Sequence, residues 1–130
     1  MKGTSYFEHY SKVPRSLWNY QSFKPSEIAS HGNGSILIHF DALQKLQLAR
    51  TIIGKPFIIL SAYRDPIHNA RVGGAPLSSH KQGHAFDISL HNQNKWHLYN
   101  VCREVGFTGF GFYNTFLHVD CGKPRTWGKW

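Results

Sequence analysis

The chain has 130 residues, of which 41% are apolar and 15% aromatic, so it carries enough apolar side chain for one globular core. We therefore expect a single domain over residues 1–130. No run approaches the roughly 18 consecutive apolar residues that span a bilayer, and the first residues lack the apolar stretch of a secretory signal. These features predict synthesis in the cytoplasm and no integral membrane segment.

Basic residues outnumber acidic ones by fifteen to seven, which gives a formal charge of +8. Such a charge favours anionic partners such as nucleic acid, anionic lipid or cell-wall polymer. The basic residues are scattered along the chain, without the cluster typical of nucleic-acid binding, and we expect no nucleic-acid partner. The two cysteines, Cys102 and Cys121, are expected to be free thiols, because a cytoplasmic chain with a good core needs no disulfide.

The N-terminal part of the chain shows little periodicity and predicts a wrapping segment over residues 1–20, followed by a short helix at Pro25–Ser30. Asp41 with Gln44 three positions later resembles a capping box and predicts the start of a helix that ends at Gly54. The apolar positions that fall on one face of this helix are Ala42, Leu46, Ala49 and Ile53.

The middle of the chain predicts two strands separated by a loop. Residues 56–63 form a short apolar run typical of a strand buried in a sheet. Residues 64–79 contain two prolines and two adjacent glycines, which predict a loop. Residues 85–90 alternate between apolar and polar side chains and predict the next strand.

The C-terminal part predicts a helix over residues 92–105 and then a hairpin. The residues at helical spacing that we expect in the core are Trp96, Tyr99, Cys102 and Val105. The two hairpin strands, residues 110–113 and 116–120, should turn at Asn114. Strands and helices do not alternate regularly, so the predicted class is α+β, with a small antiparallel sheet flanked by helices.

Two polar side chains, His80 before the strand over residues 85–90 and Asp87 on it, are candidates for a functional site. His80 lies in a turn where Gly83 permits a positive φ. Along the strand that follows, Asp87 faces away from Phe86 and Ile88, because successive side chains point to opposite faces. Asp87 is therefore turned away from the apolar side of the sheet.

The last hairpin strand alternates in the same way. His118 and Asp120 point to one face, and Leu117 and Val119 point to the other. If this hairpin lies beside the strand of Asp87, the side chains of His80, Asp87 and His118 converge. Two imidazoles and one carboxylate make the ligand set of a catalytic zinc ion, with the fourth position left for water.

The segment Ser78-x-His80-x-x-Gly83-x-Ala85-x-Asp87 resembles the signature of the zinc D-Ala-D-Ala peptidases. This family shares its fold with the hedgehog signalling domain and includes many phage endolysins. The other segments similar to the family, in the same order, are Ser61-Ala62-Tyr63-Arg64, His68-Asn69, Val72-Gly73-Gly74-Ala75, Gly109 to Tyr113, Phe116 to Asp120 and Arg125-Thr126-Trp127-Gly128. The resemblance covers residues 20–130 and implies a hedgehog/DD-peptidase-like fold.

The resemblance implies one Zn²⁺ held by His80, Asp87 and His118. It also implies that Arg64 lies near the metal and binds a substrate carbonyl or carboxylate, where a fixed guanidinium would stabilise an oxyanion. Ser78 would hold either the substrate or the loop of His80.

The chain departs from the family at one position. Many relatives carry an acidic residue three positions before the last zinc histidine, where it acts as general base, and this chain has Thr115. The alternatives for the base are Asp120, two residues after His118, and His84. For Asp120, a role in orienting a ligand histidine competes with the role of base.

These features predict a zinc metallopeptidase that hydrolyses peptide bonds of peptidoglycan, either as a D-Ala-D-Ala carboxypeptidase or as an endopeptidase of cross-links or stem peptides. We expect a monomeric phage or prophage endolysin that causes host lysis, is made in the host cytoplasm and acts on the cell wall after release. The alternative is a non-catalytic, zinc-stabilised module that binds the cell wall. Nucleic-acid binding, the third hypothesis, rests on charge alone.

Overall fold

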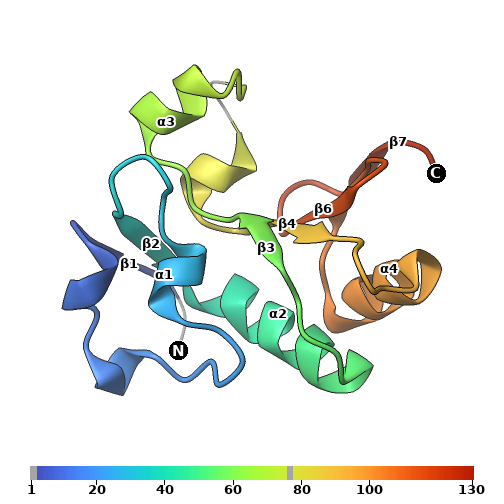
Figure 1. The fold of residues 1–130 in the computed structure, drawn as a ribbon, viewed down its shortest axis with the longest axis horizontal. Coiled ribbons are helices and arrows are strands. Elements are labelled where there is room, and N and C mark those ends of the chain that lie inside the picture. Colours follow the sequence, from blue (N-terminus) through green and yellow to red (C-terminus); the bar gives the residue numbers. More distant parts are fainter. Residues whose placement is uncertain (1–2, 76–77) are drawn as a thin grey trace.

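A computed structural model of the chain describes residues 3–75 and 78–130. Its main feature is a five-stranded sheet (Figure 1). In spatial order its strands are β3 (Ile59–Ser61), β4 (Ala85–Ser89), β6 (Phe116–Asp120), β5 (Gly109–Phe112) and β7 (Arg125–Gly128). All neighbouring pairs are antiparallel except β5 and β7, which are parallel. The predicted α+β class is confirmed, and the predicted antiparallel sheet carries in addition one parallel strand, β7, that was not predicted.

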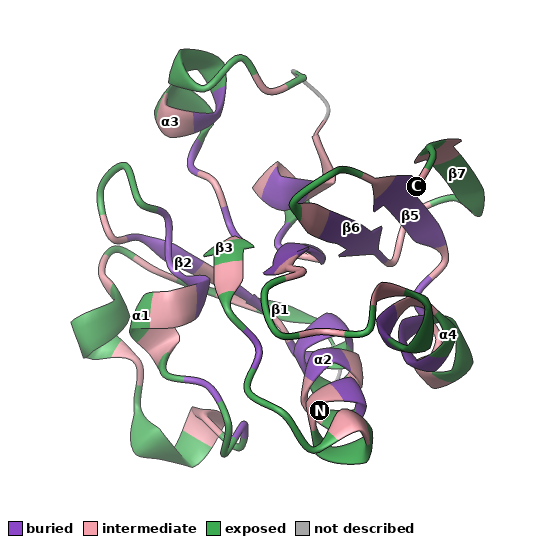
Figure 2. Cartoon of the chain, turned by 45° about the vertical axis from the view of Figure 1, so that its right-hand side comes forward, coloured by how far each residue is buried: buried purple, intermediate pink, exposed green. Residues whose placement is uncertain are grey.

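Two long helices, α2 (Phe40–Ile53) and α4 (Lys95–Val105), pack against each other and against one face of the sheet (Figures 1 and 2). The sheet side chains that lie fully buried in this core are Phe86, Ile88, Leu117 and Val119. The helical side chains buried with them include Leu43, Leu46, Leu98 and Val101. The opposite face of the sheet is thereby left for polar side chains.

A second, two-stranded sheet joins β1 (Thr4–Phe7) to β2 (Ile36–His39), and the short helix α1 (Pro25–Ile28) lies between them in sequence. Two 3-10 turns, η1 (Tyr10–Lys12) and η2 (Arg15–Leu17), complete the N-terminal segment. The predicted short helix is confirmed. The two strands were not predicted, because four-residue strands carry too little alternation to be distinguished from loop.

Helix α2 begins two residues earlier than the capping-box pattern predicts. The ring Nδ1 of His39 accepts a hydrogen bond from the backbone N–H of Ala42 at 3.2 Å, so His39 is the N-cap and the prediction of Asp41 is wrong. The predicted end is confirmed, because Gly54 adopts a left-handed φ of 73°. The predicted apolar face is also confirmed: Ala42, Leu46 and Ala49 are buried, and Ile53 packs against the core.

The segment from β3 to β4 differs from its predicted form in two ways. Strand β3 lies at the edge of the sheet and was predicted to be buried. Leu60 on this strand and Ile58 just before it are instead exposed. The predicted loop contains helix α3 (Pro66–Arg71), which begins where the Asp65 carboxylate accepts a hydrogen bond from the His68 N–H at 2.9 Å. Asp followed by Pro is a helix-start signal.

Helix α4 has Asn94 as its N-cap and Gly106 after its last residue. Its buried stripe runs through Leu98, Val101 and Cys102, so the predicted core position of Trp96 is wrong: this side chain is 53% exposed and packs edge-on against Trp130. The predicted hairpin is confirmed by β5 and β6.

Cys102 and Cys121 are free thiols, as expected. Within residues 3–75 and 78–130, the structure contains no helix with the length and apolar character needed to cross a membrane.

The packing of α2 predicts unequal effects for two leucines on the same helix. Leu46 is completely buried while Leu48 is 48% exposed, so Leu46→Ala should lower the free energy of unfolding by about 2–5 kcal/mol through lost burial and a cavity. Leu48→Ala is the matched control and should change it by less than about 1 kcal/mol. Urea denaturation measures both. Equal losses would show that α2 does not pack as described.

Candidate metal centre

The polar face of the main sheet carries two rows of neighbouring residues that run across β4, β6, β5 and β7. The first row consists of Asp87, His118, Gly111 and Trp127. The second row consists of Ala85, Asp120, Gly109 and Arg125. Strand alternation thus brings Asp87 beside His118, as the sequence predicts, and places Asp120 in the adjacent row.

His80 approaches this face from η3 (Ser79–Gln82), the turn that precedes β4. The turn ends at Gly83, whose φ of 77° confirms the predicted left-handed bend. The Ser78 hydroxyl accepts a hydrogen bond from the His80 backbone N–H at 3.2 Å. Of its two predicted roles, Ser78 therefore has the contact expected for holding the loop of His80.

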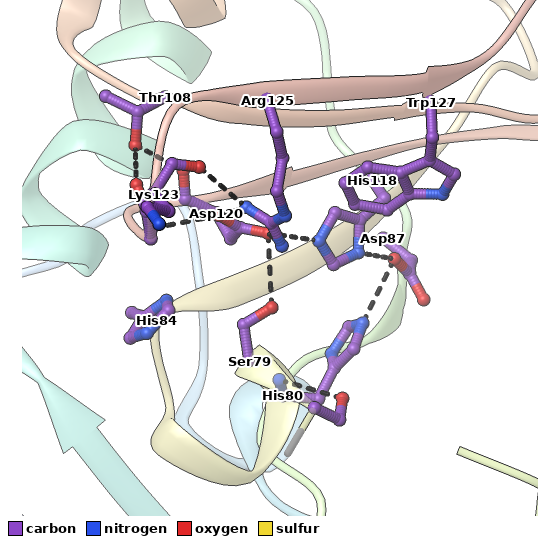
Figure 3. Close-up of polar contacts among 12 residues, drawn as sticks. Ser79, His80, His84, Asp87, Thr108, His118, Asp120, Lys123, Arg125 and Trp127 are labelled. Atoms are coloured by element: carbon purple, nitrogen blue, oxygen red, sulfur yellow. Dashed lines mark hydrogen bonds and ion pairs between the residues drawn. The ribbon is translucent and has the colours of Figure 1, made fainter. Parts of the chain in front are cut away.

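Three side chains converge where this turn meets the first row (Figure 3). Asp87 Oδ1 lies 3.2 Å from His80 Nε2 and 3.0 Å from His118 Nδ1. The three ligand atoms lie within 4.8 Å of one another, and all three residues are buried. The predicted grouping of His80, Asp87 and His118 is thus present, supplied by a turn and two adjacent strands.

In each histidine, the ring nitrogen that faces Asp87 is called the inner nitrogen and the other the outer nitrogen. Both outer nitrogens lie within hydrogen-bond distance of an acceptor other than Asp87. His80 Nδ1 lies 2.7 Å from the Ala62 carbonyl oxygen, which can only accept a hydrogen bond. His118 Nε2 lies 2.6 Å from Asp120 Oδ2. If each outer nitrogen carries the proton, the inner nitrogens present lone pairs to the Asp87 carboxylate. Three acceptors that face one another need a cation between them, so the donor chemistry fits a bound metal ion.

Asp87 is suited to such a site because it remains ionised. Burial raises the pKa of its carboxyl group, but without a metal ion the nitrogens of His118 and His80 that face Asp87 can carry protons, and their hydrogen bonds then outweigh burial and bring the pKa to about 2. Asp87 is therefore a carboxylate at any pH where the protein is expected to work.

Asp120 is completely buried, and both of its carboxylate oxygens are fully engaged. Oδ1 accepts from the Gly122 N–H and from Arg125 Nη1, each at 2.9 Å. Oδ2 accepts from Arg125 Nη2 at 2.8 Å and from the Ser79 hydroxyl at 3.1 Å, in addition to His118. Burial raises the pKa of Asp120, and the hydrogen bonds from His118 and Arg125 together hold it well below its usual range.

Arg64 lies beside the convergent group, as predicted. Its Nη2 lies 3.4 Å from Asp87 Oδ2, and its Nε donates to the Ser61 hydroxyl at 3.0 Å. Its Nη1 lies 3.4 Å from Asn69 Oδ1, and Asn69 is buried and donates to the Ala75 carbonyl at 2.9 Å. Asn69 therefore links the guanidinium of Arg64 to the segment before η3.

A cleft of about 400 Å³ opens over the three convergent side chains. The other side chains that line it are Arg64, Ser78, Ser79, Tyr113, Phe116, Arg125 and Trp127, together with residues 73–75. Among the described residues, Asp87 is the one acidic side chain that lines this cleft.

Neither Thr115, which occupies the position of the family's usual acid, nor His84, the other candidate for the base, lines this cleft. Thr115 is exposed in the turn between β5 and β6. His84 is absent from the cleft lining and instead contacts Gln82 at 2.9 Å and the ring of His39. Burial lowers the pKa of His84.

Four residues that the structure places at this site were not predicted as site residues. Asn69, Ser79, Arg125 and Trp127 each contact a predicted site residue or its partner. All four lie within segments on which the resemblance was based. Arg125 and Trp127 stand two residues apart, the spacing of side chains on one face of a strand, but the strand itself was not predicted.

Comparison with known proteins agrees with this geometry. The family model described as Peptidase M15 matches residues 21–120. The zinc D-Ala-D-Ala carboxypeptidase of Streptomyces albus G is 30% identical over 124 residues, which cover 91% of this chain and 47% of that protein. The chain thus spans about half the length of this relative. Because the family model covers most of the chain and includes all three convergent residues, the chain belongs to the peptidase M15 family.

Proposed function

We propose that this chain is a zinc-dependent peptidase that hydrolyses peptide bonds in the peptide part of peptidoglycan. The observation that carries the proposal is the convergence of two imidazole nitrogens and one buried carboxylate oxygen below an open cleft. Membership of the peptidase M15 family supports the reaction class. The name of the Streptomyces relative supports the metal and the substrate class.

The residues that would hold zinc are His80 through Nε2, Asp87 through its carboxylate and His118 through Nδ1. Nitrogen and oxygen donors in this number are typical of a catalytic zinc site. A zinc ion bound there supplies a Lewis acid that activates water and polarises a peptide carbonyl. The chain's own contribution includes holding the two ligand histidines in fixed orientations, through Ala62 behind His80 and Asp120 behind His118.

Two arginines, Arg64 and Arg125, line the cleft and give it a positive character. Peptidoglycan stem peptides carry free carboxylates, which a cleft of this charge would attract. Arg64 is held by Ser61, Asn69 and Asp87, so its guanidinium needs little reorganisation to donate to a substrate oxygen. We assign Arg64 to the stabilisation of the carbonyl oxygen as it gains negative charge.

Asp120 fits the role of orienting His118 better than the role of general base. Five donors surround its two oxygens, and no part of the side chain is exposed. A carboxylate so engaged has no lone pair left to accept a proton from water in the cleft. Its hydrogen bond to Nε2 instead directs Nδ1 of His118 towards Asp87.

We further propose that the protein acts on the bacterial cell wall as a phage or prophage endolysin. The formal charge of +8 supports this role, since it would favour adsorption to anionic envelope polymers.

Zinc should stabilise the metal-free protein. Because the ion binds the folded chain at three residues that converge only on folding, 100-fold excess over its dissociation constant should add about 2.7 kcal/mol to the free energy of unfolding. Differential scanning fluorimetry with and without zinc measures the shift in Tm. His80→Ala should abolish the shift, whereas His97→Ala, an exposed histidine on α4, should retain it. A full shift in His80→Ala would contradict the assigned site.

Digestion of purified peptidoglycan tests the reaction itself. Mass spectrometry should show peptide cleavage by the wild type, none above background by His118→Ala and full cleavage by His97→Ala. Arg64→Lys should be slower by about 100-fold, since it removes donors to the developing oxyanion. The same variants applied to permeabilised bacteria test the lytic role.

A wild-type protein that binds zinc but releases no amines from peptidoglycan would contradict the proposed hydrolysis. That result would favour the alternative of a non-catalytic module that binds the cell wall.

A further inference from the structure

Arg125 lies two strands away from His118 in the sheet, yet its guanidinium reaches the residue that holds His118. It belongs to β7 and occupies the second row, with β5 between it and Asp120 on β6. Nη1 donates to Asp120 Oδ1 at 2.9 Å and Nη2 donates to Asp120 Oδ2 at 2.8 Å (Figure 3). Two parallel hydrogen bonds of this kind fix the plane of a carboxylate as well as its position.

Gly109 makes this reach possible. It is the residue of β5 that lies between Asp120 and Arg125 in the second row. A Cβ atom at Gly109 would lie 2.1 Å from Asp120 Oδ1 and 2.3 Å from Arg125 Nη1, much closer than non-bonded atoms approach. The absence of a side chain at this position thus opens the path by which β7 contacts β6.

Asp120 in turn contacts His118, one of the three proposed metal ligands. With the carboxylate plane fixed, Oδ2 is aimed at His118 Nε2, 2.6 Å away. The hydrogen bond at Nε2 sets the orientation of the ring and leaves Nδ1 facing Asp87 at 3.0 Å. Partners of this kind behind a ligand histidine typically change metal affinity 10–100-fold when they are removed.

We propose that Arg125 is a positioning residue that sets the metal affinity of the centre through Asp120 and His118. The inference rests on the proposed zinc site. It assigns to β7 a part in the metal centre, although β7 supplies no ligand. It also gives Gly109 a role, because the hydrogen bonds between Arg125 and Asp120 require the space above that residue.

A simpler role is available to Arg125, because its side chain is 41% exposed and lines the cleft. In that role its charge would bind a substrate carboxylate, and metal affinity would not depend on it. Arg125→Lys separates the two roles, since lysine keeps the charge but cannot form two parallel hydrogen bonds with one carboxylate.

The test is the zinc dissociation constant, measured by competition with a chromophoric chelator in the absence of substrate. We expect Arg125→Gln and Arg125→Lys each to weaken zinc binding about tenfold. Arg15→Gln, an exposed arginine in η2, is the matched control and should stay within about twofold of wild type. Wild-type affinity in Arg125→Lys would overturn the proposal.

A double-mutant cycle tests the route through Asp120. If Arg125 acts only through that residue, adding Arg125→Gln to Asp120→Asn should weaken zinc binding no further than Asp120→Asn alone. Effects that multiply in the double variant would overturn the route.

Gly109→Ala offers an independent variant that removes no polar group. Its added methyl group should force Arg125 and Asp120 apart and weaken zinc binding, and circular dichroism checks that it folds. Unchanged affinity in a folded Gly109→Ala would contradict the geometry.

These zinc measurements are independent of hydrolysis. A protein that binds zinc as predicted but cleaves no peptidoglycan would overturn the proposed function and leave this inference standing. Conversely, Arg125 variants with wild-type affinity would overturn this inference alone.

Discussion

The site depends on one electrostatic constraint, the meeting of two imidazole nitrogens with a single carboxylate oxygen of Asp87 at 3.0 and 3.2 Å. Because the outer nitrogens of His80 and His118 face fixed acceptors, the inner nitrogens are available as lone pairs. A buried cluster of acceptors is unfavourable unless a cation lies among them. The architecture around the cluster can be understood as the means of holding these atoms together.

The sheet performs this task by dividing its two faces. Phe86, Ile88, Leu117 and Val119 fix β4 and β6 to the helical layer, which leaves the alternate residues of the same strands on the polar face. Asp87 and His118 are thus positioned by the apolar core behind them. The register of β4 and β6, which pairs these two residues directly, is as important to the site as the identity of the residues.

On the polar face of the sheet, two glycines leave space for side chains from β7 to contact residues of β6. Gly109 leaves room for Arg125 to contact Asp120, and Gly111 leaves room for the Trp127 ring, which lies 4.9 Å from the ring of His118. A Cβ at Gly111 would lie 2.5 Å from Trp127. Both glycines lie on β5, so this strand contributes to the site through the side chains it lacks.

Much of the site was predictable from sequence because strand alternation is a local property. It predicted that Asp87 and His118 would face the same side, and the structure pairs them. The edge position of β3 and the parallel pairing of β7 were not predictable in this way, since both depend on which strands meet in space. Arg125 was missed as a site residue for that reason.

Two details of the helices were predicted wrongly from local sequence, the N-cap of α2 and the buried face of α4. Asp41 and Gln44 matched a capping box, but the His39 ring caps α2, a role that the capping pattern does not include. In α4 the aromatic side chain of Trp96 suggested burial, while the stripe through Leu98, Val101 and Cys102 decides which face is covered. Residue type was a weaker guide than the complete helical pattern.

The proposed metal centre is tested most directly by anomalous diffraction at the zinc absorption edge from crystals of the zinc-loaded protein. We expect an anomalous peak bound by Nε2 of His80, a carboxylate oxygen of Asp87 and Nδ1 of His118, with Nε2 of His118 still bonded to Asp120. Zinc bound at other residues, or coordinated by His118 through Nε2, would contradict the proposed centre.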